Sequence, residues 1–376
     1  MLSFVKSHRN WLVGTGLLLV AVPAYGQTGY KQTNLVSDIP GLAAVTDPDL
    51  ANPWGLASTP TSPWWAADNG TDKSTLYNGN TGVKNNAVIV GIPALAPTGV
   101  VFNNTTGFLL ANNVKASFIF STETGAIAAW NGGATAATMQ TVAGAAYKGL
   151  AIGTANSASF LYASDFLGGK VQVFNTTFAP TTLSGNFTDP NLPSNYAPFG
   201  IQNLGGKIYV TYAETSGVPG DIDEVDGLGK GFVDVYDTNG NLLQRVASGG
   251  TLNAPWGLAL APSNFGDFSN DLLVGNFGDG TINAFDPSNN FAFEGQLRDL
   301  GGNPIAIDGL WALAFGNGGN AGLTDSLYFT AGLNEENNGL LGYLHVPEPL
   351  TLSVFAAGLA GTALLRRRRR NRVTPD

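Results

Sequence analysis

Asp and Asn residues recur along the chain at comparable places, next to short apolar runs. Asp68, Asn112, Asp165 and Asn276 close such runs, and Asp308 precedes another. Ca²⁺ accepts six to eight oxygen ligands, among them carboxylate and amide oxygens. The five residues are therefore a candidate calcium site if the fold brings them together. The structural alternative is that each forms a turn, because Asp and Asn at strand ends commonly bond to their own backbone.

Histidine and cysteine restrict the chemistry further. The chain has no Cys, and its two histidines are His8 and His345, near the two ends. A Ser-His-Asp triad or a histidine-dependent lactonase mechanism therefore has no base within the body of the chain. A hydrolase built from this sequence would need metal-bound water with an Asp as the base, for which Asp68 and Asp165 are the candidates.

A repeat indicates which elements must position these residues. The segment NPWGLASTP begins at Asn52, and APWGLALAP begins at Ala254. Weaker copies occur between and after them, so six units follow one another at spacings of 44 to 57 residues. The aligned positions are Trp54, Thr98, Lys148, Phe199, Trp256 and Trp311.

Each unit contains alternating apolar segments separated by turns, as antiparallel strands do. After the PWGLA-type strand we expect a second strand, which in unit two is the segment GFLLANN at 107–113, and then a third and a fourth. Six four-stranded units predict an all-β, six-bladed β-propeller. The segment at 30–37 is expected to complete the last blade and so close the ring.

In such a ring, the starts of the first strands and the turns between second and third strands share one face, at the mouth of the central channel. Trp54, Phe199, Trp256 and Trp311 would either pack between blades or form an aromatic platform for a glycan. The insertion at 214–231 carries Asp221, Asp223, Glu224 and Asp226 and should overhang the same mouth. It lacks an EF-hand register, so it is either a lid or cation clamp, or a solvated acidic loop.

Both ends of the chain predict export. Residues 1–26 have the basic start, apolar stretch and small-residue ending of a signal peptide. Residues 27–345 form the propeller, 346–370 a transmembrane sorting segment, and 371–376 a short cytoplasmic tail. The sorting segment consists of Pro347, Glu348 and Pro349, then an apolar run, then Arg366, Arg367, Arg368, Arg369 and Arg370.

This C-terminal pattern resembles the PEP-CTERM sorting signal of Gram-negative bacteria. The resemblance implies export by the Sec machinery, anchoring through the C-terminal helix with the arginines in the cytoplasm, and cleavage near 347–349 by an exosortase-type enzyme. A plain C-terminal membrane anchor is the alternative. After cleavage the propeller would reach the cell surface or the extracellular matrix.

The repeat units are similar to an uncharacterised family of exported bacterial proteins, many with the same sorting tail, and more distantly to NHL-type and calcium-dependent phosphotriesterase-like propellers. The segment GFVDVYDTNGNLLQRVASGGTLNAPWGLALAP, beginning at Gly231, carries this resemblance most clearly. Some of these distant relatives are hydrolases that hold calcium, and this resemblance supports the calcium hypothesis for this chain. A shared fold does not by itself imply a shared activity.

Charge and composition favour a binding role. Between 27 and 346 there are ten Lys and Arg against 25 Asp and Glu, a net charge of −15. Nucleic acid is therefore not an expected partner. We expect an exported, non-catalytic binding or structural propeller whose partner is an exopolysaccharide or another envelope component. The alternative is a calcium-dependent hydrolase of the lactonase or phosphotriesterase kind, acting at the channel mouth.

Overall fold

A computed structural model of the chain describes residues 28–111 and 113–347. The predicted signal peptide, the cytoplasmic tail and the candidate ligand Asn112 lie outside the described residues. So do Glu348, Pro349 and the five arginines at 366–370 of the predicted sorting segment. Within the described part of the chain, no helix is long and apolar enough to cross a bilayer.

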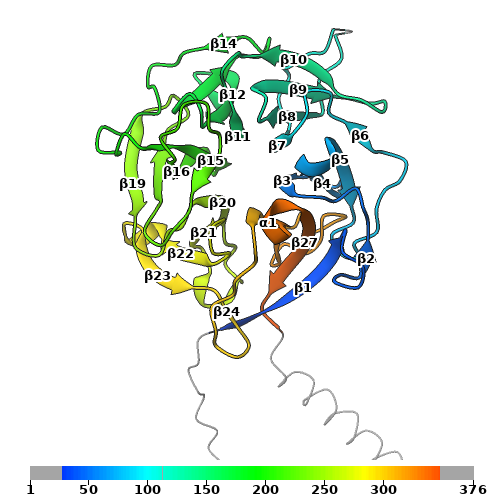
Figure 1. Cartoon of the computed structure of the whole chain (residues 1–376), viewed down its shortest axis with the longest axis vertical. Coiled ribbons are helices and arrows are strands. Elements are labelled where there is room, and N and C mark those ends of the chain that lie inside the picture. The colour runs from blue at the N-terminus through cyan, green and yellow to red at the C-terminus, as the bar shows by residue number, and fades with distance from the viewer. Residues whose placement is uncertain (1–27, 112, 348–376) are drawn as a thin grey trace, which may run out of the picture.

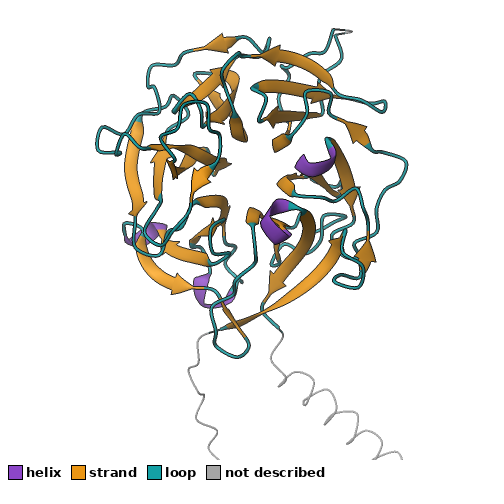
Figure 2. Ribbon diagram, viewed as in Figure 1, coloured by secondary structure: helices purple, strands orange, loops and turns teal. Residues whose placement is uncertain are grey.

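The described residues form six sheets arranged around a central axis, which confirms the six-bladed propeller (Figures 1 and 2). From the axis outward, blade one consists of β3 (Pro53–Ala57), β4 (Trp64–Asp68), β5 (Lys73–Tyr77) and β6 (Val90–Gly91). Blade two consists of β7 (Pro97–Phe102), β8 (Phe118–Thr122), β9 (Ala126–Trp130) and β10 (Ala137–Thr141). Blade three consists of β11 (Tyr147–Ala155), β12 (Ala158–Asp165), β13 (Lys170–Phe174) and β14 (Pro180–Thr181).

The other three blades follow the same order. Blade four consists of β15 (Tyr196–Leu204), β16 (Lys207–Thr215), β18 (Phe232–Tyr236) and β19 (Leu242–Ser248), with the short β17 (Glu224–Val225) beside β16. Blade five consists of β20 (Pro255–Leu260), β21 (Leu272–Asn276), β22 (Ile282–Asp286) and β23 (Ala292–Gln296). Blade six consists of β25 (Leu310–Phe315), β26 (Leu327–Gly332), β27 (Asn338–His345) and β1 (Gly29–Ser37), flanked by β2 (Val45–Thr46) and β24 (Arg298–Asp299).

In residues 28–111 and 113–347, helical structure is limited to single turns in loops. These are η1 (Asn69–Thr71), η2 (Gly266–Phe268), η3 (Pro287–Asn289) and α1 (Leu333–Glu336). The hydrophobic clusters lie mostly between neighbouring blades, as in blades one and two, where Trp65 of β4 stacks on Phe118 of β8 with ring centroids 4.0 Å apart. The apolar surface buried between the faces of neighbouring blades, rather than within a single sheet, therefore stabilises the ring.

The N-terminal strand closes the ring as predicted. β1 runs antiparallel to β27, with Lys31 opposite His345 and Ser37 opposite Leu340. The strand that precedes blade one in the chain thus belongs to the sheet of blade six. The two ends of the described chain therefore lie side by side (Figure 1). This pairing covers what would otherwise be an open edge of β27.

The glycine of the PWGLA repeat has a direct steric cause. A Cβ on Gly55 would lie 2.5 Å from the carbonyl oxygen of Thr98 in the next blade, and one on Gly200 would lie 2.1 Å from that of Trp256. Inner strands of adjacent blades therefore pass each other backbone to backbone at this position. Each of the six aligned segments forms an innermost strand, which confirms the repeat alignment.

The second strand of blade two was predicted wrongly. β8 occupies Phe118–Thr122, whereas the described residues of the apolar segment 107–113 form a loop. The segment is apolar because it covers the boundary between blades two and three. Phe108 is fully buried there, 5.3 Å from the ring of Phe178. Apolar content alone does not distinguish such a covering loop from a strand.

Candidate functional site

Three of the five predicted calcium ligands occupy equivalent positions. Asp68, Asp165 and Asn276 end the second strands of blades one, three and five, opposite the first residues of the inner strands. Asp308 lies just before the inner strand β25. All four are thus at the ends of the blades where the inner strands start.

Their side chains bond locally instead of converging on one point. Asp68 is fully buried and accepts a hydrogen bond from the Thr75 hydroxyl (2.7 Å). Asp165 accepts from the backbone N–H groups of Ala146 and Gly168 (3.1 and 2.9 Å). Asn276 accepts from the N–H of Asn253 and donates to the Thr251 carbonyl (3.1 and 2.8 Å). In the part of the chain that the structure describes, no three or more Asp, Glu, His or Cys side chains form a group that could hold a metal.

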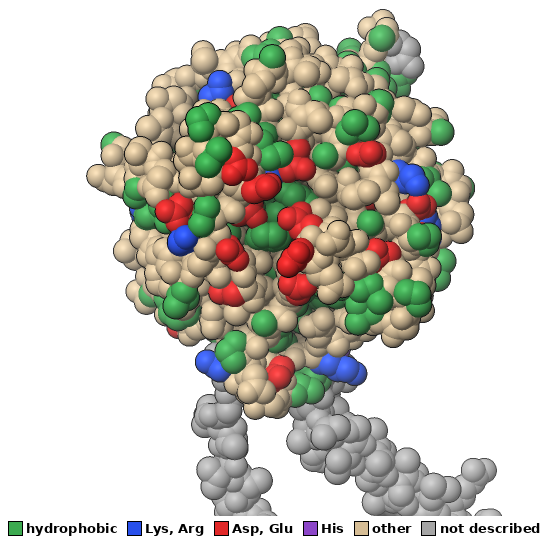
Figure 3. Space-filling view, in the orientation of Figure 1, with side chains coloured by type: hydrophobic (Ala, Val, Ile, Leu, Met, Phe, Trp, Pro, Cys, Tyr) green, Lys and Arg blue, Asp and Glu red, His purple; other side chains and the backbone are tan. Residues whose placement is uncertain are grey.

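The structure instead gathers a different set of carboxylates at the same end of the channel. A cavity of about 390 Å³ opens there, which we call the acidic mouth. It includes one predicted ligand, Asp308, and three acidic residues of the 214–231 insertion, which overhangs the mouth as expected. Its carboxylates are Asp223, Glu224, Asp226, Asp308, Glu335 and Glu336. Figure 3 shows acidic side chains gathered around the centre of this face.

Glu335 and Glu336 were missed by the sequence analysis, and they stand on a strained turn. In α1, Asn334, Glu335 and Glu336 all have positive φ (54°, 54° and 62°), so α1 is a left-handed turn built without glycine. Each such residue costs about 1–2 kcal/mol. The amide N–H of Asn334 donates to the carboxylate of Asp308 (2.8 Å), which ties the turn to the loop before β25. The only signal in the sequence was the pair of adjacent glutamates.

A hydrogen-bonded chain links the acidic mouth to the interior. The Asn52 amide donates to the carboxylate of Glu336 (2.7 Å) and accepts from the Trp311 indole N–H (3.1 Å). Burial raises the pKa of Glu336, although the bond from Asn52 and the charge of Lys148 act in the opposite direction. The bond from Asn52 thus holds the Glu336 carboxylate in place, while burial still disfavours its ionised form.

Lys148 is the buried cation of the site. It replaces the repeated tryptophan at the start of β11, is 2% exposed, and pairs with Glu123 at 2.5 Å. Its ammonium group lies 5.0 Å from the ring centroid of Trp54, in cation–π contact. Burial lowers the pKa of Lys148, but the carboxylates of Glu123 and Glu224 outweigh this effect, so its pKa is raised.

Glu224 has the most perturbed carboxyl group of the acidic mouth. Burial, with smaller contributions from Glu336 and Asp223, raises its pKa from 4.5 to about 7, against the lowering effect of Lys148. Several carboxylates thus share a space in which one ammonium group is already paired with Glu123. Such an arrangement attracts a further positive charge.

An aromatic layer lies beneath the acidic mouth. Phe277, which lines the mouth, stacks on Trp311 (4.2 Å between centroids), and Trp311 stacks on Trp54 (3.6 Å). Trp256 and Phe199 also pack against Trp311. The repeated aromatic residues are at most 9% exposed and pack on one another across the axis, so they are core rather than an open platform.

Below the aromatic layer the channel narrows to a void of about 30 Å³. It is lined by the aliphatic residues that follow the repeat glycine, among them Leu56, Val100, Leu150 and Ile201. This space holds roughly one or two water molecules. This narrow section lies between the two ends of the channel.

Comparison with known proteins agrees with this class of molecule, a six-bladed β-propeller. The solved structure of a streptogramin B lyase superimposes with a TM-score of 0.51 at 12% identity, covering 85% of this chain and 97% of that one. A putative gluconolactonase superimposes with a TM-score of 0.52 at 12% identity, covering 84% and 92%. At such identity the likeness concerns the fold alone. No family model matches the chain.

Two relatives from Acanthamoeba polyphaga mimivirus are closer in sequence. Uncharacterized protein R648 is 32% identical over 344 residues, covering 85% of this chain and 81% of the relative. Uncharacterized protein L690 is 31% identical over 339 residues, covering 84% and 85%. The chain belongs to the family of these two proteins. Since both are viral, the resemblance to an exported bacterial family with a sorting tail stays a prediction.

Proposed function

We propose that the protein is an exported, non-catalytic binding propeller of the cell envelope, and that its acidic mouth holds a positively charged group of its partner. The partner we infer is an exopolysaccharide that carries amines, or another cationic envelope component. In this proposal the Sec machinery exports the chain, and an exosortase-type enzyme cuts the anchored tail near 347–349.

One observation carries the binding proposal: six carboxylates line one cavity while Lys148, the buried cation next to them, is already paired with Glu123. Like charges in a partly buried space raise each other's free energy, which a bound cation lowers. The left-handed turn that presents Glu335 and Glu336 supports the same conclusion, because non-glycine backbone strain of this kind is concentrated at functional sites.

An ammonium-bearing partner suits the acidic mouth better than a single metal ion. The carboxylates come from separate loops of blades four and six, and amines on a polymer can contact several of them at once. The Phe277 ring at the base adds a surface for cation–π contact. Asp68 and Asp165, the candidate bases of a hydrolase, already accept hydrogen bonds, from the Thr75 hydroxyl of the neighbouring strand and from the Gly168 N–H respectively, which favours binding over hydrolysis.

Calorimetric titration of the full chain with a glucosamine tetramer tests the binding proposal. We expect binding at pH 6.5, where much of the tetramer's amine is protonated, and this binding should weaken with added salt. Changing both Glu224→Gln and Glu336→Gln should reduce the affinity at least tenfold. Glu294→Gln, an exposed acid on the outer strand β23, is the matched control and should change nothing.

Two results would contradict this proposal. One is unchanged binding of the tetramer by the double variant. The other is calcium chloride binding tightly at the same mouth and excluding the tetramer, which would restore the calcium hypothesis. Export is tested separately, by following the size and surface exposure of the chain when the arginines at 366–370 are removed.

A further inference from the structure

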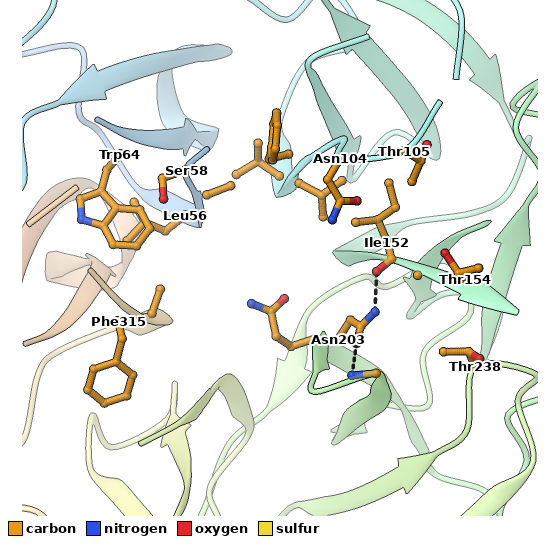
Figure 4. Close-up of a pocket in the computed structure, with 18 residues that line it drawn as sticks. Leu56, Ser58, Trp64, Asn104, Thr105, Ile152, Thr154, Asn203, Thr238 and Phe315 are labelled. Carbon is orange, nitrogen blue, oxygen red and sulfur yellow. Dashed lines mark hydrogen bonds between the residues drawn. The ribbon is translucent and has the colours of Figure 1, made fainter. Parts of the chain in front are cut away.

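The opposite end of the channel has a second, larger cavity of about 640 Å³, which we call the neutral mouth. It lies where the inner strands end, beyond the aliphatic constriction, and residues of blades one, two, three, four and six line it. Figure 4 shows Leu56, Ser58, Trp64 and Phe315 on one side, with Asn104, Thr154, Asn203 and Thr238 across from them. No Asp, Glu, Lys, Arg or His is among the described residues that line it.

The polar groups of the neutral mouth are largely unused by the protein. Within the described chain, the side chains of Ser58, Asn104, Thr154, Gln202 and Thr238 make no hydrogen bond to another residue. Asn203 differs. Its amide donates to the Ile152 carbonyl of blade three (2.8 Å) and accepts from the Gly206 N–H (3.1 Å), so it links blades three and four at the edge of the cavity. Hydroxyls and amides both donate and accept hydrogen bonds, so these side chains match a ligand that does the same.

Aromatic rings flank these polar groups. Phe102 and Phe315 hold the same repeat position in blades two and six, on either side of Ser58 in blade one. Both rings are partly exposed, unlike the buried aromatic layer near the acidic mouth. Gln202 lies at the boundary between the cavity and the constriction, because it lines both. The cavity thus combines partly exposed aromatic rings with unpaired neutral polar groups and has the size of a small-ligand site.

The geometry points to a binding site for a neutral saccharide at the neutral mouth. A neutral sugar ring has apolar C–H faces that can lie on Phe102 or Phe315, and hydroxyls that can bond to Gln202, Thr238 and Ser58. Charged sugars are disfavoured, because no opposite charge is present to offset their desolvation. The site is independent of the cation-binding function proposed above, since the 30 Å³ constriction separates the two mouths.

Titration of the full chain with neutral tetrasaccharides of glucose, mannose or galactose tests this inference. At least one of them should bind, and Gln202→Ala should weaken that binding about fivefold, the loss expected for one or two hydrogen bonds. Thr238→Val, which keeps the side-chain shape, should weaken it by a smaller factor. Glu336→Gln at the acidic mouth should leave it unchanged, and an oligomer of glucuronic acid should not bind.

Three outcomes would overturn the inference: no tetrasaccharide binds, binding persists at full strength in both variants, or binding is lost in Glu336→Gln. The last outcome would place the sugar at the acidic mouth. Failure of the glucosamine tetramer to bind would instead contradict the proposed function and leave the neutral mouth unaffected. Thermal melting of each variant checks that it remains folded.

Discussion

Replacing Glu224 by Gln should change how the stability of the propeller depends on pH. The pKa of Glu224 is raised to about 7 in the folded protein, chiefly by burial. Between pH 4.5 and 7 the folded state therefore binds more protons at this group than the unfolded state does. The stabilising contribution is present below pH 4.5 and is lost as the pH rises toward 7.

The magnitude follows from the shift. One pKa unit corresponds to about 1.4 kcal/mol, so a rise from 4.5 to about 7 makes wild-type protein about 3 kcal/mol less stable at pH 8 than it would be with an unperturbed glutamate. Glu224→Gln removes the titrating group. The variant should gain about 3 kcal/mol relative to wild type between pH 4.5 and pH 8, which is a rise in Tm of about 4 °C for a domain of this size.

The assay is thermal melting of both proteins at several pH values across this range, at low ionic strength. Other buried carboxyl groups also titrate, so only the difference between variant and wild type is informative. Glu335→Gln is the matched control, because Glu335 lines the same cavity but is exposed. If the curves of Glu224→Gln and wild type stay parallel from pH 4.5 to 8, Glu224 is not held in the buried, charged environment described above.

Three further predictions concern the same face and the ring. Lys148→Met should lower stability by about 3 kcal/mol at pH 8 in urea unfolding, because it leaves Glu123 and Glu224 without their buried cation. The loss should be smaller at pH 5, because Glu224, whose pKa is about 7, is then protonated; an equal loss at both pH values would contradict this. Glu335→Gly should be about 1 kcal/mol more stable than Glu335→Gln, since both remove the charge but only glycine relieves the positive φ; equal urea midpoints would argue against strain. Gly200→Ala should lower Tm strongly or abolish the melting transition, because the added Cβ would lie 2.1 Å from the Trp256 carbonyl oxygen. Gly319→Ala is the control and should melt like wild type, because the nearest atom to its Cβ would be 3.4 Å away.

Much of the fold could be predicted because its signals are local. The glycine of PWGLA recurs in the innermost strands of five blades, and at four of these positions, Gly55, Gly99, Gly200 and Gly257, the backbone of the next blade leaves no room for a Cβ. The segments at 170–174 and 232–236 form strands, as the alternation of apolar and polar residues along them predicts. Closure by the N-terminal strand followed from the missing fourth strand of the last unit.

Prediction was less successful where a residue's role depends on contacts outside its own strand. The run around Phe108 is apolar because it covers Phe178 of the next blade, a contact that the period of the sequence does not reveal. Asp68 and Asp165 have the residue type of metal ligands, but their partners are the hydroxyl of Thr75 and nearby backbone N–H groups.

The sequence by itself determined the number of blades, the position of each innermost strand and an acidic body without a histidine base. Only the tertiary structure decided which carboxylates meet, because Glu224 lies in blade four whereas Asp308 and Glu336 lie in two loops of blade six, and blade packing brings them together. It also decided that Lys148 lies over Trp54 and that the two mouths are separated. Strand patterns arise from neighbours along the chain, whereas the environment of a charge depends on every group that folding places near it.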